Sequence, residues 1–106
     1  MGRMVMVGYR PRPGKEQQLL GIVKEHLLIL RTEGLATDRA SLAMRATDGT
    51  IIEVFEWKSQ AAIDAAHENQ TVRAMWARFE EACELVPISH LAETKQLFAG
   101  FEPLEV

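Results

Sequence analysis

Glu53, Glu56, a tryptophan and a histidine lie around one strand-to-helix junction in the stretch Ile52–His67, which reads IEVFEWKSQAAIDAAH. Glu53 is the strongest candidate for a chemical role, because the alternating strand pattern surrounds it with apolar side chains. A carboxylate in such surroundings must be paired, hydrogen-bonded or protonated. His26, on the apolar side of a predicted helix, is a natural partner. Glu53 and His26 are therefore the predicted catalytic pair, in which the carboxylate orients the imidazole for removal of a proton from a ligand.

Large side chains near this pair could form the walls of a binding pocket. The predicted substrate-binding residues are Trp57, Phe55, Trp76, Met44 and His67. Aromatic residues at strand or helix periodicity are also ordinary core residues, and the helix dipole alone stabilises a histidine at a helix end. A structural role therefore stays open for each of these side chains, and equally for a buried Glu53 with His26.

The strongest turn signal in the chain is Asp48-Gly49. It predicts a two-residue hairpin turn, because both residues tolerate positive φ angles. Counting outward from this turn places Met44 opposite Glu53. One face of the hairpin then combines apolar side chains with a single carboxylate: Ala40, Leu42, Met44, Ala46, Ile51, Glu53, Phe55 and Trp57. The other face carries Arg45 and Glu56, for which an ion pair between subunits is the favoured interpretation.

Hydrophobic periodicity predicts the elements around the hairpin. Met4–Tyr9 is a continuous apolar run, which indicates a strand buried on both faces. Apolar residues at three- and four-residue intervals predict a helix over residues 15–33 that ends at Gly34. Ser59 is typical of the N-cap of a short helix, and Asn69 can begin a second helical segment.

The last predicted strand covers residues 85–88 and contains Pro87, which belongs at a sheet edge because it cannot donate a ladder hydrogen bond. The tail, residues 89–106, has enough apolar side chains that we expect it to dock on this chain or on a partner. The order β-α-β-β-α-β predicts one α+β domain over residues 1–106 with a ferredoxin-like antiparallel sheet. In that fold the first and third strands are central and the second and fourth are edges.

Three segments carry a resemblance to a known family: the first strand followed by RPGKE, the hairpin ending in EWKSQAAIDAAH, and the helix VRAMWARFEEA. Over about residues 3–88 the chain resembles the dimeric α+β-barrel superfamily of antibiotic-biosynthesis-monooxygenase-like proteins. In that superfamily two ferredoxin-like chains pack their sheets face to face, and small molecules bind between sheet and helices. The resemblance thus implies a homodimer, which would also explain a first strand buried on both faces.

For function, the resemblance implies a cofactor-independent monooxygenase that acts on an aromatic or polyketide-like molecule, with Glu53 or His26 removing a phenolic proton. A non-catalytic ligand-binding or stress-related dimer is the alternative, since fold does not determine function. Haem degradation fits less well. Haem-degrading members of the superfamily have an asparagine on the first strand, and this first strand has none. They also have a tryptophan and a histidine around the second helix, and near those positions this chain has Ala66 and Met75.

Size and composition narrow the class of protein. A chain of 106 residues is long enough for one domain, and its net charge of −3 argues against a nucleic-acid-binding surface. Apolar runs such as Leu27–Leu30 are far shorter than the ~20 residues of a membrane span, and the N-terminus has no signal-peptide core. We therefore expect a cytoplasmic protein with no membrane partner. A single cysteine, Cys83, excludes an intrachain disulfide, and the sequence predicts no metal site and no cofactor.

Overall fold

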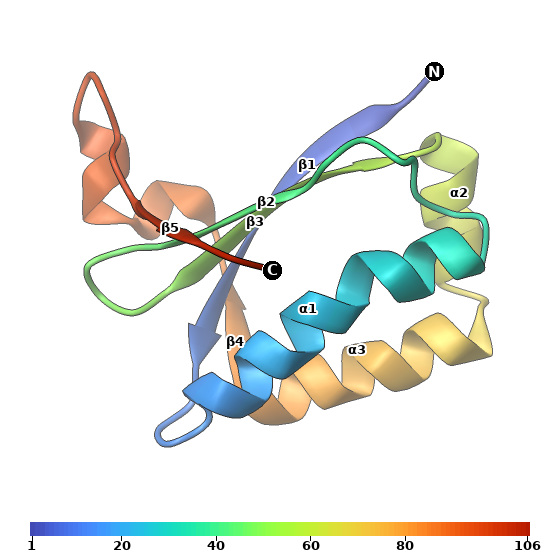
Figure 1. Ribbon diagram of the computed structural model, residues 1–106, viewed down its shortest axis with the longest axis horizontal. Coiled ribbons are helices and arrows are strands. Elements are labelled where there is room, and N and C mark those ends of the chain that lie inside the picture. Colours follow the sequence, from blue (N-terminus) through green and yellow to red (C-terminus); the bar gives the residue numbers. More distant parts are fainter.

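A five-stranded antiparallel sheet forms the centre of the molecule (Figure 1). In the computed structural model, which describes residues 1–106, the strands are β1 (Arg3–Pro11), β2 (Leu42–Arg45), β3 (Ile51–Trp57), β4 (Cys83–Val86) and β5 (Glu102–Leu104). They lie in the order β4-β1-β3-β2-β5. The predicted α+β architecture is confirmed and is compatible with a ferredoxin-like fold, with β1 and β3 central and β4 at an edge. β2 is not an edge strand, because β5 pairs with it.

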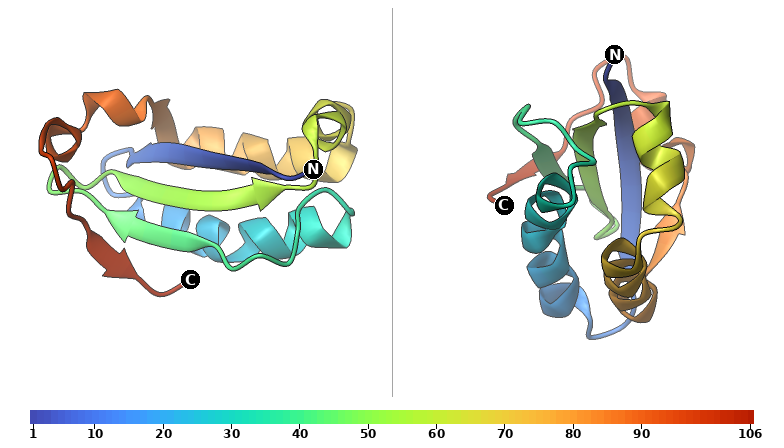
Figure 2. Two further views of the ribbon diagram at one scale, coloured as in Figure 1. Left: turned by 90° about the horizontal axis from the view of Figure 1, so that it is seen from above. Right: turned by 90° about the vertical axis from the view of Figure 1, so that its right-hand side faces the viewer.

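Three helices lie on one face of the sheet (Figure 2): α1 (Glu16–Thr32), α2 (Gln60–Ala66) and α3 (Gln70–Ala82). Both predicted N-caps are confirmed. Ser59 Oγ accepts from the Ala62 amide at 3.1 Å, and Asn69 Oδ1 accepts from the Val72 amide at 3.0 Å. Gly34 follows α1 with a φ of 76°, a left-handed conformation that favours glycine and ends the helix as predicted. None of the helices combines the length and the apolar character needed to span a membrane.

The hairpin between β2 and β3 has a longer loop than the sequence predicts. The Ala46 amide donates to the Thr50 carbonyl at 2.8 Å, so three residues, 47–49, lie between the closing pair. Gly49 has a φ of 93°, as in three-residue hairpin loops that end with a left-handed glycine. The prediction of a two-residue turn is therefore wrong.

This extra loop residue reverses the faces of β2. Ala43, not Met44, lies opposite Glu53. Because side chains alternate along a strand, a shift of one residue moves each of them to the other face of the sheet. Met44 therefore lies on the face away from the helices. The prediction that it lies beside Glu53 on one face of the sheet is wrong. Arg45 lies on the helix side, where it forms an ion pair with Glu16 of α1 in its own chain.

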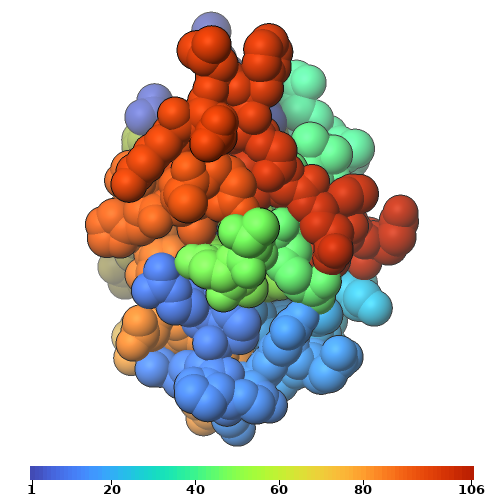
Figure 3. All heavy atoms as spheres, turned by 90° about the vertical axis from the view of Figure 1, so that its left-hand side faces the viewer, coloured from blue at the N-terminus to red at the C-terminus, as the bar shows by residue number.

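The chain after β4 folds back onto its own sheet. Pro87 lies just beyond β4 rather than within it as predicted, whereas the edge position of β4 is confirmed. Two short 3-10 turns, η1 (Ile88–His90) and η2 (Ala92–Lys95), then lead to β5. Leu91 between them is fully buried in a second small core with Ile52 of β3. Figure 3 shows this tail, coloured orange to red, packed over the hairpin.

The two faces of the sheet are covered to different extents. The main core lies between the sheet and the helices, and its fully buried side chains include Leu19, Ile22, Leu30, Ile51, Phe55, Val72 and Met75. On the opposite face, Met4 and Met6 of β1 and Leu42 of β2 are 52%, 54% and 60% exposed. Within one chain, the first half of β1 is therefore covered on one face only.

Candidate active site

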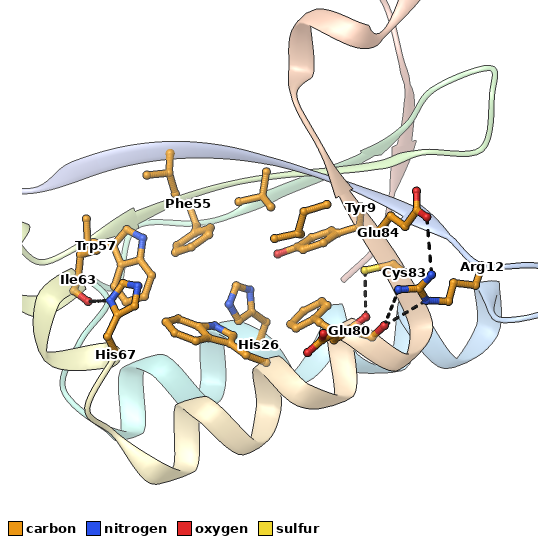
Figure 4. A pocket seen from close by; sticks show the side chains of 15 residues that line it. Tyr9, Arg12, His26, Phe55, Trp57, Ile63, His67, Glu80, Cys83 and Glu84 are labelled. Atoms are coloured by element: carbon orange, nitrogen blue, oxygen red, sulfur yellow. Dashed lines mark hydrogen bonds and ion pairs between the residues drawn. The ribbon is translucent and has the colours of Figure 1, made fainter.

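An open cavity of about 830 Å³ lies between the sheet and the helices (Figure 4). This volume is in the range of pockets that bind small molecules. Its walls come from β1, β3 and β4 on one side and from the helices on the other. β4 pairs with β1 only over Gly8–Pro11. The cavity extends along the half of β1 that β4 leaves unpaired, where Val5 and Val7 line it and remain partly exposed.

Four of the five predicted substrate-binding residues line this cavity. Phe55 and Trp57 extend from β3, Trp76 from α3, and His67 directly follows α2. Met44 does not line it, because the hairpin register places that side chain on the opposite face of the sheet. The predicted catalytic pair is divided between wall and interior: His26 lines the cavity, whereas Glu53 lies behind the wall.

Glu53 accepts two hydrogen bonds at one carboxylate oxygen. The Tyr9 hydroxyl donates to Oε1 at 2.8 Å, and Nδ1 of His26 lies 2.7 Å from the same atom. All three residues are almost completely buried, with exposed fractions of 1% for Glu53 and 3% for Tyr9 and His26. The predicted hydrogen bond between Glu53 and His26 is thus confirmed, and Tyr9 is a third member of the network.

These hydrogen bonds determine which nitrogen of His26 is free. The Glu53 carboxylate can only accept, so Nδ1 of His26 acts as the donor to it, and the neutral ring then carries its proton on Nδ1. Nε2 makes no hydrogen bond within the chain. The rings of Phe55 and Phe79 pack edge to face against the imidazole at centroid distances of 5.1 and 5.2 Å. In this neutral tautomer the ring keeps its lone pair on Nε2, an arrangement that suits a general base on a cavity wall.

Tyr9 is the site residue that the sequence reasoning does not single out. Its ring stacks on Phe79 at a centroid distance of 4.7 Å. Burial, and then the negative charge of Glu53, raise the pKa of Tyr9 well above its ordinary value, so the hydroxyl remains protonated and donates. Alternation along β1 places Tyr9 on the same face as Val5 and Val7, and this pattern was the available signal.

The other end of the cavity is polar (Figure 4). Nε and Nη2 of Arg12 donate to the Glu80 carbonyl at 3.1 and 3.0 Å, and Nη1 lies 3.7 Å from a carboxylate oxygen of Glu84. The Cys83 thiol donates to the Phe79 carbonyl at 3.1 Å, and burial raises its pKa to about 11. These groups are engaged within the chain. No group of three or more His, Cys, Asp or Glu side chains is arranged to hold a metal ion.

No protein-family model, curated protein or solved structure matches this chain.

Proposed function

We propose that the protein is a cofactor-independent monooxygenase that binds a small aromatic or polyketide-like molecule in the cavity. The supporting observation is the imidazole of His26, which Glu53 orients so that Nε2 is free at the wall of an aromatic pocket. Phe55, Trp57 and Trp76 offer flat apolar surfaces for a ligand ring and exclude water around it. The oxygenation itself is an analogy with the superfamily that the sequence resembles.

In the proposed reaction, Nε2 of His26 accepts the proton of a phenolic hydroxyl, and Glu53 stabilises the imidazolium that forms. The phenolate passes electrons to dioxygen, and a C–O bond forms at the ring carbon para to the phenolate oxygen. His26 returns its proton to the resulting peroxide. Loss of water from this hydroperoxide, which uses the hydrogen on the same carbon, leaves a second carbonyl. One oxygen atom of O₂ thus enters the product and the other leaves as water.

A non-catalytic ligand-binding protein is the second candidate. Glu53, His26 and Tyr9 satisfy one another within the chain, and the Glu53 carboxylate does not reach the cavity wall. Networks of this kind also stabilise protein cores that perform no chemistry. The cavity would then serve for binding alone.

The proposal includes a homodimer in which the two sheets pack face to face as an α+β barrel. The exposed Met4, Met6 and Leu42 supply an apolar surface on the face that the helices leave uncovered. The cavity lies on the other side of the sheet, between sheet and helices. Each protomer would therefore carry its own site.

The test uses anthrone, whose enol tautomer is a phenol with a reactive carbon para to its hydroxyl. We expect the protein to consume oxygen and form anthraquinone faster than spontaneous oxidation does. His26→Gln should lower this rate by about 100-fold or more, because general-base catalysis contributes on that scale. His90→Gln, in the exposed η1 turn, is the matched control and should leave the rate unchanged.

Binding of anthrone measured by calorimetry separates the two candidates. Binding without protein-dependent oxygen uptake would support the ligand-binding protein and contradict the oxygenase for this substrate class. Full activity in His26→Gln would contradict the role of His26 as the base.

A further inference from the structure

Two histidines on the cavity wall have the same hydrogen-bonding arrangement. Nδ1 of His26 is held by the Glu53 carboxylate at 2.7 Å, and Nδ1 of His67 is held by the Ile63 carbonyl at 2.9 Å. Neither Nε2 atom has a hydrogen-bond partner within the chain. The two residues come from different parts of the fold, His26 from the middle of α1 and His67 from the end of α2.

The tautomer of His67 follows from its partner. A backbone carbonyl can only accept, so Nδ1 of His67 must carry the proton, and Nε2 of the neutral ring has a free lone pair. The ring also packs edge to face on Trp76 at a centroid distance of 5.1 Å, which restricts its orientation. His67 is exposed where it lines the cavity, so Nε2 of its neutral ring can accept from a ligand group in place of water.

Most other polar groups on the wall already have partners. The Tyr9 hydroxyl, the Arg12 guanidinium and the Cys83 thiol donate to groups of the protein. The indole N–H groups of Trp57 and Trp76 have no partner within the chain and could donate to a ligand oxygen. A ligand hydroxyl group can interact with both kinds of unpaired group, because it can donate to an imidazole nitrogen and accept from an indole N–H.

We infer that the cavity selects aromatic ligands with two hydrogen-bond-donating groups, one for Nε2 of His26 and one for Nε2 of His67, over ligands of the same shape whose oxygens only accept. At the buried His26, an analogue that lacks the donor leaves Nε2 unpaired and is therefore bound less tightly. At the exposed His67, water can replace the missing donor, so the discrimination there is smaller. This inference rests on the proposal that the cavity holds an aromatic ligand. It adds that the ligand donates hydrogen bonds to the cavity wall, and it makes His67 a specificity-determining residue.

The test compares two probes with identical rings, 2,6-dihydroxynaphthalene and 2,6-dimethoxynaphthalene, by calorimetry at pH 8, which favours neutral imidazole. We expect the diol to bind roughly tenfold more tightly than the diether. His67→Phe keeps an aromatic ring beside Trp76 but removes the acceptor. It should weaken binding of the diol to the level of 2-naphthol and leave the diether unchanged, whereas His90→Phe should change neither. Equal binding of diol and diether to the native protein, or equal weakening of both by His67→Phe, would overturn the inference.

A second measurement requires no ligand. Nitrogen-15 chemical shifts distinguish the two neutral tautomers of histidine, and we expect both His26 and His67 to carry the proton on Nδ1. A proton on Nε2 of His67 would contradict the inference even if binding were detected. Neither readout depends on turnover, so absence of oxygen uptake would count against the oxygenase proposal alone.

Discussion

At the scale of single residues, the buried hydrogen bond between Glu53 and His26 makes each side chain depend on the other. Replacing either by glutamine leaves the partner with a poorer hydrogen bond in a buried position, which typically costs about 1–3 kcal/mol. We expect Glu53→Gln and His26→Gln each to lower the free energy of unfolding by that amount. The double variant should lose less than the sum, because the second change removes an interaction that is already broken.

Urea denaturation of the native protein, the two single variants and the double variant measures this coupling. His90→Gln serves as the control, since His90 is exposed and should change the free energy of unfolding little. Strictly additive losses would show that Glu53 and His26 do not stabilise one another in solution.

Cys83 provides a prediction that depends on pH. Burial raises the pKa of its thiol from 9.0 to about 11, so the reactive thiolate forms in the folded protein only as the pH rises through about 11. At pH 8 the folded protein should contain roughly 100-fold less thiolate than the unfolded chain. We therefore expect iodoacetamide to modify folded Cys83 at least ~100-fold more slowly than the chain in urea, as followed by mass spectrometry. Equal rates would contradict a buried, hydrogen-bonded thiol.

The site could be predicted in part because Glu53 and His26 are each a polar residue within an apolar periodic pattern. Alternation along β1 could indicate the face on which Tyr9 lies, but not its contact with Glu53. Its partner Glu53 is 44 residues away in the sequence, and their contact depends on how β1 pairs with β3. The predicted face of Met44 is wrong for a local reason, because that face follows directly from the length of the hairpin loop.

At the scale of elements, local signals are reliable where one residue decides the geometry. Ser59 and Asn69 cap helices as their side chains predict, and Gly34 ends α1. The Asp48-Gly49 pair is compatible with both a two-residue and a three-residue hairpin loop, and only the pairing of the strands distinguishes them. β5 has three residues and includes a proline, so no strand signal is available there.

Two glycine substitutions test this view of the elements. Gly49 has a positive φ and no neighbouring atom near the position of an added Cβ, so Gly49→Ala acts through backbone strain alone. It should destabilise the protein by about 1 kcal/mol. Gly21 lies inside α1, is exposed and also has free space around it. Gly21→Ala should therefore stabilise the protein by about 0.5–1 kcal/mol.

Thermal or urea unfolding of the two glycine variants gives both values, and each serves as the control of the other. A stabilising effect of Gly49→Ala would contradict the left-handed conformation at the end of the hairpin loop.

At the scale of the whole molecule, the face of the sheet away from the helices is only half covered. Ile52 and Leu91 belong to the small core beneath the tail. Beside it, Met6, Val54 and Leu42 are cross-strand neighbours that form an apolar row over β1, β3 and β2. An apolar surface of this kind on a sheet is typical of a protein interface, and the same patch on a second copy is complementary under twofold symmetry.

We therefore expect the native protein to scatter light as a dimer with twice the chain mass of 11.9 kDa. Met6→Lys should shift it to the monomer, because a face-to-face contact would bury the introduced charge without a partner. The matched control is Leu28→Lys, which changes an apolar residue on α1, outside this face, that is 67% exposed against 54% for Met6. Both variants should remain folded, since both side chains are more than half exposed in the single chain. A monomeric native protein at high concentration, or dissociation caused equally by both variants, would contradict packing through this face and leave the cavity on the other side of the sheet as the site of a monomer.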